Sequence, residues 1–320
     1  VSDLNLKIPW IYNVAMKRIY TYGHEQVQRN LTIGDIVENK KKGVKMTQVT
    51  AQNREEAEIL SEQNIDMIIT GSDTYEDVRN GAPNTFITAA LFAGRFITKD
   101  DILKGAIEVA MKGADSVLTP RSPEIVEMLA NEGMHVQGHV GMVPSDATKF
   151  GGIRTVGKTV NEALEILKDL KDLENAGAFG AEVECVAEDA LIEISKHTDL
   201  VLNSLGAGSG GDVIFLFFED IVGETKNIKM PRHAKSWGDG NKILNELKLE
   251  RSEAISAFKN DVENSKYPNS DYTISMDDGE LDKLINELEK EWVQSLKNSS
   301  YYLDFTDLTG GFGLQKDLKT

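Results

Sequence analysis

The alternation of short apolar runs with longer segments of helical spacing constrains the fold of this chain more than any other feature. It extends from residue 46 to about residue 260 and predicts parallel strands joined by crossover helices. Eight runs are candidate strands, a number that favours a closed (β/α)8 TIM barrel over an open sheet. They are Met46–Thr50, Met67–Thr70, Thr85–Ala89, Ser116–Leu118, His135–Gly138, Ala181–Val186, Leu200–Asn203 and Ile228–Lys235.

The segments outside these strands predict three regions. Residues 1–30 form an N-terminal extension, residues 31–266 form the barrel, and residues 267–320 form a C-terminal helix and tail. We expect both extensions to be helical, with residues 299–320 as an arm or a disordered end. The C-terminal helix is amphipathic and packs on its own barrel or on another subunit; its apolar residues are Leu281, Leu284, Ile285, Leu288 and Trp292.

Composition excludes several classes of partner. The net charge of −17 predicts repulsion of nucleic acid and of anionic membranes. Cys185 is the single cysteine, which rules out an intrachain disulfide and a cysteine-rich metal site. Because no apolar run approaches the roughly 20 residues that span a bilayer, and the first residues show no signal pattern, we expect a cytoplasmic protein that binds a small molecule.

Carboxylates and a histidine lie where a barrel would place chemistry. Side chains alternate along a strand, so Glu182 and Glu184 face one side while Val183 and Cys185 face the other. Two interior carboxylates are costly to bury as ions, so we expect them to meet water, a cation, a substrate or an arginine, or at least one to take up a proton. His139 follows the fifth predicted strand, at the end where barrel enzymes place their active sites.

Two glycine-rich loops follow predicted strands. Gly206, Gly208 and Gly211 match the G-x-G-x-x-G spacing before a helix predicted to start at Asp212. Loops after the seventh strand of barrels commonly bind anions, so this loop is interpreted as part of a substrate pocket, with a phosphate site as the alternative. The long loop of residues 139–159 is predicted to be a lid, with disorder as the alternative.

Four segments, in this order, resemble the active-site segments of the ketopantoate (3-methyl-2-oxobutanoate) hydroxymethyltransferase family, which belongs to the phosphoenolpyruvate/pyruvate superfamily of (β/α)8 barrels. They are residues 138–144, 150–152, 182–186 and 205–208. The resemblance implies that Mg²⁺ holds a 2-oxo acid as an enolate, which attacks the one-carbon unit of methylenetetrahydrofolate. It also implies a homo-oligomer, Glu184 as the base, His139 as a substrate contact, and a substrate pocket that includes Gly206, Ala207 and Gly208.

The same resemblance indicates that the family's metal ligands are replaced. Ser72 stands at the position of the first metal-binding aspartate and Ala90 at that of the second, while Leu118 and Pro120 replace a lysine and a glutamate. Mg²⁺ requires oxygen ligands, usually anchored by carboxylates. We therefore expect a divergent member without the family's Mg²⁺ site.

An arginine is the predicted substitute for the metal. Arg121 can grip a carboxylate and stabilise enolate charge, although its position also fits a surface arginine at a helix start. Ser72, Asp73 and Glu182 are predicted to contribute to substrate binding. The alternatives are a metal site rebuilt from Asp73 and Glu182, or an ion pair of the glutamates with Arg95 or Arg121.

The sequence thus predicts an enzyme, a transferase or lyase, that makes or breaks a carbon–carbon bond next to the carbonyl of a small 2-oxo acid. Glu184 moves the proton, while His139 and Arg121 hold oxygens. The alternative is a non-catalytic barrel that binds a metabolite or serves as a subunit of an assembly. Neither reading identifies the substrate or the number of subunits.

Overall fold

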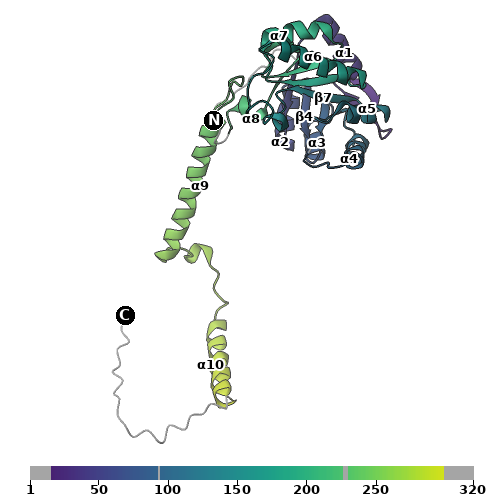
Figure 1. The fold of residues 1–320 in the computed structure, drawn as a ribbon. Coiled ribbons are helices and arrows are strands. Elements are labelled where there is room, and N and C mark those ends of the chain that lie inside the picture. Colours follow the sequence, from purple (N-terminus) through teal and green to yellow (C-terminus); the bar gives the residue numbers. More distant parts are fainter. Residues whose placement is uncertain (1–15, 93, 226–229, 299–320) are drawn as a thin grey trace, which may run out of the picture. The chain divides into compact units, whose positions relative to one another are not determined.

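The structure, a computed structural model, describes residues 16–92, 94–225 and 230–298. Eight parallel strands close into a barrel in the order β10-β3-β4-β5-β6-β7-β8-β9, which confirms the predicted (β/α)8 fold. Figure 1 shows helices around the strands, of which β4 and β7 are labelled. The strands are β3 (Met46–Thr50), β4 (Met67–Gly71), β5 (Phe86–Ala90), β6 (Ser116–Leu118), β7 (Val136–Gly141), β8 (Gly180–Glu184), β9 (Val201–Leu205) and β10 (Val213–Leu216). The accompanying helices are α1 (Ile33–Lys42), α2 (Arg54–Glu62), α3 (Tyr75–Gly81), α4 (Lys99–Met111), α5 (Pro123–Asn131), α6 (Val160–Asn175), α7 (Glu188–Ile194) and α8 (Phe218–Val222).

The last barrel strand differs from the prediction. Seven predicted strands coincide with β3 to β9, but the eighth, Ile228–Lys235, is wrong: residues 230–235 form turns and irregular structure, and residues 228–229 lie outside the described residues. The helix predicted from Asp212 is also wrong, because that residue leads into β10, which closes the barrel between β9 and β3. Val213 and Phe215 are buried there, as expected for a β-branched and aromatic run.

Glycines make the connection from β9 to β10 unusually short. It contains a single 3₁₀ turn, Gly208–Gly210, where a barrel normally has a helix. A Cβ atom on Gly210 would lie 2.7 Å from the backbone nitrogen of Ile192, and one on Gly211 would lie 2.8 Å from the carbonyl oxygen of Leu202. The glycine spacing therefore lets the chain run directly against α7 and β9.

The barrel interior consists of layers. The layer at the N-terminal end is apolar and packs on Ile36 of α1; its strand residues are Met46, Met67, Phe86, Val201 and Val213. A second apolar group lies toward the C-terminal end and consists of Ile69, Ala90, Leu118, Leu205 and Phe215. Interior residues from alternate strands form such layers in barrels of this type.

A buried polar layer separates these two groups. The side-chain amide of Asn203 donates to Gln48 Oε1 at 3.1 Å and to Gln137 Oε1 at 3.0 Å. Thr88 Oγ1 accepts from Gln137 Nε2 at 3.3 Å and lies 2.8 Å from Ser116 Oγ. These hydrogen bonds satisfy most of the polar atoms that the barrel buries at this level.

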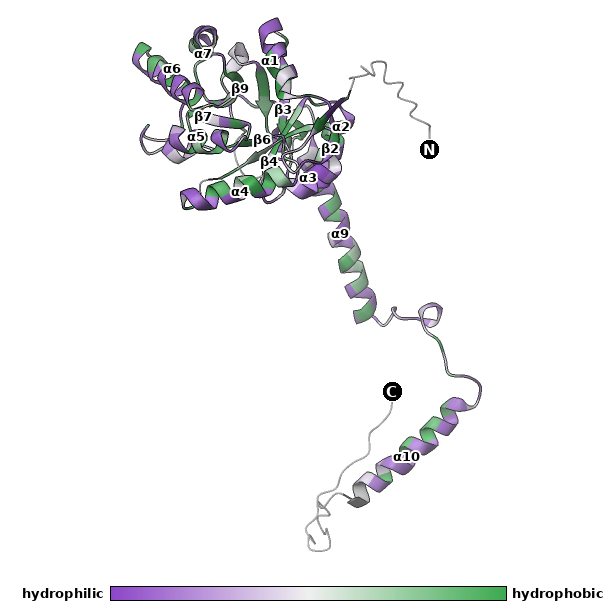
Figure 2. Ribbon diagram, turned by 90° about the vertical axis from the view of Figure 1, so that its right-hand side faces the viewer, coloured by the Kyte–Doolittle hydropathy of each residue, from purple (hydrophilic) through white to green (hydrophobic). Residues whose placement is uncertain are grey.

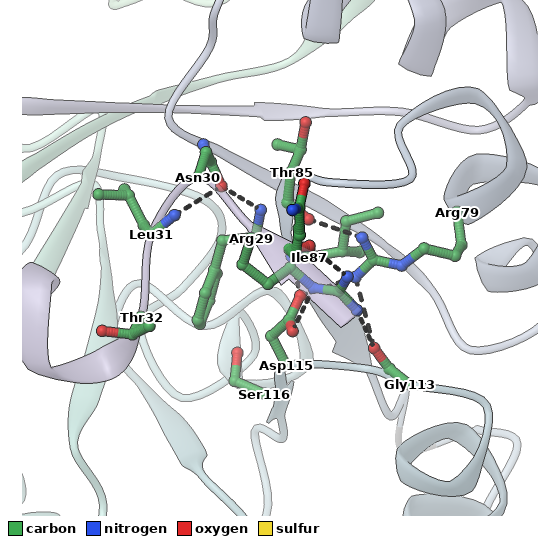
Figure 3. Close-up of polar contacts among 12 residues, drawn as sticks. Arg29, Asn30, Leu31, Thr32, Arg79, Thr85, Ile87, Gly113, Asp115 and Ser116 are labelled. Carbon is green, nitrogen blue, oxygen red and sulfur yellow. Dashed lines mark hydrogen bonds and ion pairs between the residues drawn. The ribbon is translucent and has the colours of Figure 1, made fainter. Parts of the chain in front are cut away.

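A two-stranded antiparallel sheet, β1 (Lys17–Tyr20) and β2 (Gln26–Arg29), precedes the barrel. The expectation of a helical N-terminal extension is therefore wrong for its described part, where alternation of period two produces a hairpin. Figure 3 shows how Arg29, at the end of β2, contacts Asp115 before β6. Arg29 Nε lies 2.7 Å from Oδ1 of this carboxylate, and Arg79 Nη2 lies 2.7 Å from its Oδ2.

The chain consists of two compact units, residues 1–245 and 246–320. Helix α9 (Gly240–Glu263) crosses this division, and α10 (Glu280–Asn298) lies in the second unit. Helix α10 confirms the predicted amphipathic helix, because its apolar residues recur at helical spacing. Figure 2 shows both hydrophobic and hydrophilic positions along this helix. Its apolar stripe is exposed in this chain and comprises Leu281, Leu284, Ile285, Leu288 and Trp292. Within the described ranges, no helix combines the length and apolar character needed to cross a membrane.

Candidate active site

Strands β7 and β8 bring His139, Glu182 and Glu184 together at the C-terminal end of the barrel. His139 pairs in register with Glu182, and Gly141 pairs with Glu184. The imidazole Nε2 lies 3.0 Å from Glu184 Oε2 and 3.6 Å from Glu182 Oε1. Val183 is fully buried in the core behind the strand, which confirms that the two glutamates share the inner face.

The backbone is tightly constrained where these strands end. A Cβ atom on Gly141, whose φ is 89°, would lie 2.4 Å from the carbonyl oxygen of Glu184. The same oxygen accepts a hydrogen bond of 2.8 Å from the backbone of Met142. Cys185 has a φ of 49°, in the left-handed region that non-glycine residues adopt mainly at constrained positions. The constrained backbone fixes the strand end that carries Glu184.

A cavity of about 420 Å³ opens at this end of the barrel, and all three side chains line it. Apart from them, its lining is uncharged: Thr50, Gln52, Ile69, Thr70, Gly71, Ala90, Phe92, Leu118, Pro120, Val143, Pro144, Ser145, Leu205, Phe215 and Phe217. A few polar groups within an apolar wall are typical of a small-molecule site. The described residues thus form a pocket whose charges are concentrated on one side.

The three titratable groups influence one another. Burial raises the pKa of Glu182 to about 7, with the positive charge of His139 opposing the shift and the negative charge of Glu184 adding to it. Burial alone would lower the pKa of His139, but its hydrogen bond to Glu184 and the charges of both glutamates raise it overall. The hydrogen bond to Glu184 thus favours the protonated form of His139, and Glu182 beside it is partly protonated near pH 7.

Three other predicted site residues lie beside this cavity and are absent from its described lining. The backbone of Ser72 donates to Ala90 at 3.1 Å, and Asp73 forms a half-exposed ion pair of 2.9 Å with Arg95. Arg121 donates from Nη1 to the carbonyl oxygen of Phe96 at 2.8 Å. No glutamate pairs with an arginine among the described contacts of the site. Substrate-binding roles for Ser72, Asp73 and Arg121 stay predictions.

A second cavity, of about 260 Å³, adjoins the first and shares Pro120, His139 and Val143 with it. Arg121 and Lys149 line this adjoining cavity. Asp146, Asp169 and Asp172 line it as well, so cationic and anionic side chains lie together on that side of His139. Within this mixed lining, Arg121 is the group that could grip the carboxylate of a ligand.

Gly206, Ala207 and Gly208, in the loop after β9, are absent from the described lining of the main cavity. A Cβ atom on Gly206 would meet the ring of His233 at 2.7 Å, Ala207 is fully buried in the core, and the carbonyl of Gly208 accepts from Ser204 at 2.6 Å. Glu188 accepts hydrogen bonds from the backbone and hydroxyl of Ser209. The carboxylate of Glu188 thus accepts from donors of this loop that could otherwise bind an anion. A substrate role for Gly206, Ala207 and Gly208 stays a prediction.

Sequence reasoning missed several residues that line the cavity. Thr50 is the last residue of β3, Gln52 follows that strand, and Phe217 follows β10. Their position at or just after the ends of barrel strands was the available signal, because active sites of this fold are built from such positions. Residues 143–145 come from the loop predicted to be a lid, and their place in the lining supports that prediction.

The Mg²⁺ site implied by the resemblance does not fit the residues present. Ala90, Leu118 and Pro120 line the cavity but offer no oxygen ligand. Asp73 pairs with Arg95 instead. Among the described residues, a group that could hold a cation is His139, Glu182 and Glu184, which lie on β7 and β8.

Comparison with known proteins places the chain among relatives with one recurring name. The sequence model of the family described as ketopantoate hydroxymethyltransferase matches residues 73–270, more than half of the chain. The 3-methyl-2-oxobutanoate hydroxymethyltransferase 1 of Methylibium petroleiphilum is 25% identical over 288 residues, covering 82% of this chain and 95% of that protein. The protein named 3-methyl-2-oxobutanoate hydroxymethyltransferase from Ignicoccus hospitalis is 28% identical over 269 residues, covering 76% and 99%.

One solved structure with partial likeness is a 2,3-dimethylmalate lyase, a member of the PEP mutase/isocitrate lyase superfamily. It aligns with 83% of this chain and 99% of its own, at 10% identity and a TM-score of 0.45. A likeness of this size adds nothing to the assignment of function.

Proposed function

Because this chain belongs to the ketopantoate hydroxymethyltransferase family, a family of transferases, we propose that it makes or breaks a carbon–carbon bond next to the carbonyl of a small 2-oxo acid. Glu184 is the proposed base, and the family's Mg²⁺ site takes no part. The observation that supports this most strongly is the 3.0 Å contact between Glu184 and His139 at the wall of the cavity. A carboxylate beside an imidazole, at the C-terminal end of a barrel, suits proton abstraction.

The proposed roles follow from the positions of the side chains. Glu184 removes a proton from the carbon next to the keto group, and His139 holds an oxygen of the substrate. Glu182, with its pKa raised to about 7 by burial, donates a hydrogen bond to the developing enolate oxygen when it is protonated. Hydrogen-bond donors aimed at developing negative charge lower the barrier of such reactions.

The substrate carboxylate is proposed to point toward the adjoining cavity. Arg121 lines that cavity, and its guanidinium uses Nη1 for the Phe96 carbonyl. A guanidinium carries five donors, so the others stay free for a ligand. The electrophile is a further prediction, for which the family implies the one-carbon unit of methylenetetrahydrofolate.

Hydrogen–deuterium exchange tests the proton-transfer step without requiring the electrophile. We expect the protein to accelerate exchange of the proton next to the keto group of 3-methyl-2-oxobutanoate in D2O, measured by NMR. Glu184→Gln keeps the shape and removes the base, so the rate should fall by roughly 10² to 10⁴-fold. Glu193→Gln, on the exposed surface of α7, is the matched control and should keep the full rate. Equal rates in the two variants would contradict the role of Glu184.

A further inference from the structure

The three titratable side chains of the main cavity are arranged like the ligands of one ion. His139 Nε2 and one oxygen from each of Glu182 and Glu184 all lie within 4.8 Å of one another. Two of these separations are 3.0 and 3.6 Å. Ligand atoms that lie about 2.0 to 2.2 Å from a shared ion, at tetrahedral or octahedral angles, are about 2.8 to 3.6 Å apart. We propose that His139, Glu182 and Glu184 bind one divalent first-row transition-metal ion.

The surroundings of Glu182 support a missing cationic partner. This residue is 6% exposed and lines the cavity, yet its carboxylate accepts no hydrogen bond within the described ranges, and His139 at 3.6 Å is its charged neighbour. Asn203, its register partner on β9, directs its amide to Gln48 and Gln137 instead. A buried carboxylate without a close partner is costly. A bound ion would supply that partner.

Charge balance gives a second argument, and this one rests on the proposed function. A 2-oxo acid is an anion, whereas the charged lining of the main cavity comprises two carboxylates and one imidazole. A divalent ion would offset both carboxylates and leave a coordination position for the keto oxygen, in place of the hydrogen bonds proposed above for Glu182 and His139 in the metal-free site. The substrate could then approach without meeting uncompensated negative charge.

The ligand types select the class of ion. An imidazole nitrogen with two carboxylates suits Mn²⁺, Fe²⁺, Co²⁺ or Zn²⁺, whereas Mg²⁺ prefers oxygen ligands alone. This site is therefore distinct in position and chemistry from the family's ligand set, whose places are taken by Ala90 and Pro120. A carboxylate that binds through one oxygen keeps the other, so ligation by Glu184 Oε2 leaves Oε1 to accept the substrate proton.

Metal binding to the full chain tests the inference directly. The chain is stripped with chelator, and Co²⁺, Zn²⁺ and Mg²⁺ are titrated separately by calorimetry without substrate. We expect one Co²⁺ or Zn²⁺ per chain, a visible Co²⁺ absorption band, and no comparable binding of Mg²⁺. Glu182→Gln should weaken Co²⁺ binding by roughly 100-fold or more, since removal of supporting groups alone costs 10 to 100-fold.

Two further variants keep the result interpretable. Glu193→Gln, exposed on α7, should bind Co²⁺ as the parent does, and His139→Gln should lose binding as Glu182→Gln does. Glu182→Gln replaces a buried carboxyl by a neutral group of the same shape, and a cooperative thermal transition confirms that it folds. Absence of stoichiometric Co²⁺ or Zn²⁺ binding, or unchanged affinity in folded Glu182→Gln, would overturn the proposed site.

The site and the proposed function can fail separately. Stoichiometric Co²⁺ binding with no proton exchange on any 2-oxo acid would leave the metal site standing and reject the proposed function. Proton exchange that persists in chelator, in a protein that binds no transition metal, would reject the metal site alone.

Discussion

The two ends of the barrel each bury a cluster of charged side chains, and the clusters differ in how completely they are satisfied. At the N-terminal end, Asp115 accepts from Arg29 and Arg79 at 2.7 Å each and from the backbone of Ile87 at 2.9 Å. At the C-terminal end, Glu182 accepts no hydrogen bond from the described residues, and the charged groups beside it are His139, at 3.6 Å, and Glu184. The first cluster is complete within the described chain, and the second lines a cavity.

This difference separates a structural use of buried charge from a chemical one. The Asp115 cluster links β2, α3 and β6, so its ion pairs hold the hairpin and the barrel together. Breaking a buried pair leaves an uncompensated charge. The second cluster, His139, Glu182 and Glu184, comes from two adjacent strands and joins no distant segments. Its incompletely paired carboxylate is therefore available to a ligand. The predictions below test this distinction.

Removal of Asp115 should have the largest effect. Asp115→Ala leaves two guanidinium groups without their carboxylate, and we expect a loss of about 3 to 5 kcal/mol in the free energy of unfolding, measured by urea denaturation. Asp172→Ala, which breaks the exposed pair with Lys168 on α6, is the control and should cost less than about 1 kcal/mol. Similar losses in the two variants would mean that the buried Asp115 cluster stabilises the fold no more than an exposed ion pair does.

Arg121 should affect binding and leave stability nearly unchanged. Its side chain is bonded to one carbonyl oxygen, whereas Arg29 and Arg79 are committed to Asp115. Arg121→Ala should weaken binding of a 2-oxo acid by about 1.5 to 3 kcal/mol, the range for hydrogen bonds to charged groups, as measured by calorimetry. Arg54→Ala on the exposed face of α2 should not change the affinity. If both variants bind alike, Arg121 is a surface arginine at a helix start.

Stability of the metal-free protein should fall as pH rises, because of the C-terminal cluster. Burial raises the pKa of Glu182 from its ordinary 4.5 to about 7, so between these values the folded state binds more protons than the unfolded state. His139, whose pKa is also raised, loses its stabilising contribution as pH rises through its folded pKa. The two groups therefore act in the same direction.

Glu182→Gln isolates the carboxyl contribution. We expect this variant to be more stable than the parent at pH 8, by on the order of 1 to 3 kcal/mol, and to show a smaller slope between pH 5 and 7 in chelator-treated urea titrations. Glu193→Gln should follow the parent curve. Parallel curves for Glu182→Gln and the parent would mean that Glu182 ionises normally, and the contrast between the two ends would then be wrong.

Self-association should leave both clusters unchanged. The exposed apolar stripe of α10 offers a surface for another copy of the chain, and the family resemblance implies an oligomer. We expect light scattering at micromolar concentration to show an oligomer, and Leu288→Glu to dissociate it without altering the thermal transition of the barrel. A monomeric parent protein would reject this prediction.

The fold was predictable to the extent that its signals are local. Apolar runs located seven barrel strands, and alternation placed Glu182 and Glu184 on one face. The eighth strand was wrong because Val213–Leu216 follows a glycine spacing that elsewhere introduces a helix. Here the glycines instead let the backbone lie against Leu202 and Ile192. A sequence pattern cannot distinguish this use of glycine from a ligand-binding turn.

Long-range contacts limited the prediction of the site. His139 was identified from a strand end and Glu184 from alternation and the family resemblance, and the structure brings them together. Two hydrogen bonds depend on the course of loops that have no periodic pattern. Arg121 donates to the carbonyl of Phe96, and the backbone of Ser209 donates to Glu188. Such contacts decide which polar groups are free for a ligand.

The short glycine connection between β9 and β10 also limits how this barrel can diversify. Its backbone lies so close to α7 and β9 that a side chain at residue 210 or 211 would require those elements to move. Insertions and random substitutions in this loop should thus be selected against. The loop of residues 142–159, which contributes to the cavity wall and has more space, is where laboratory evolution should find new specificities.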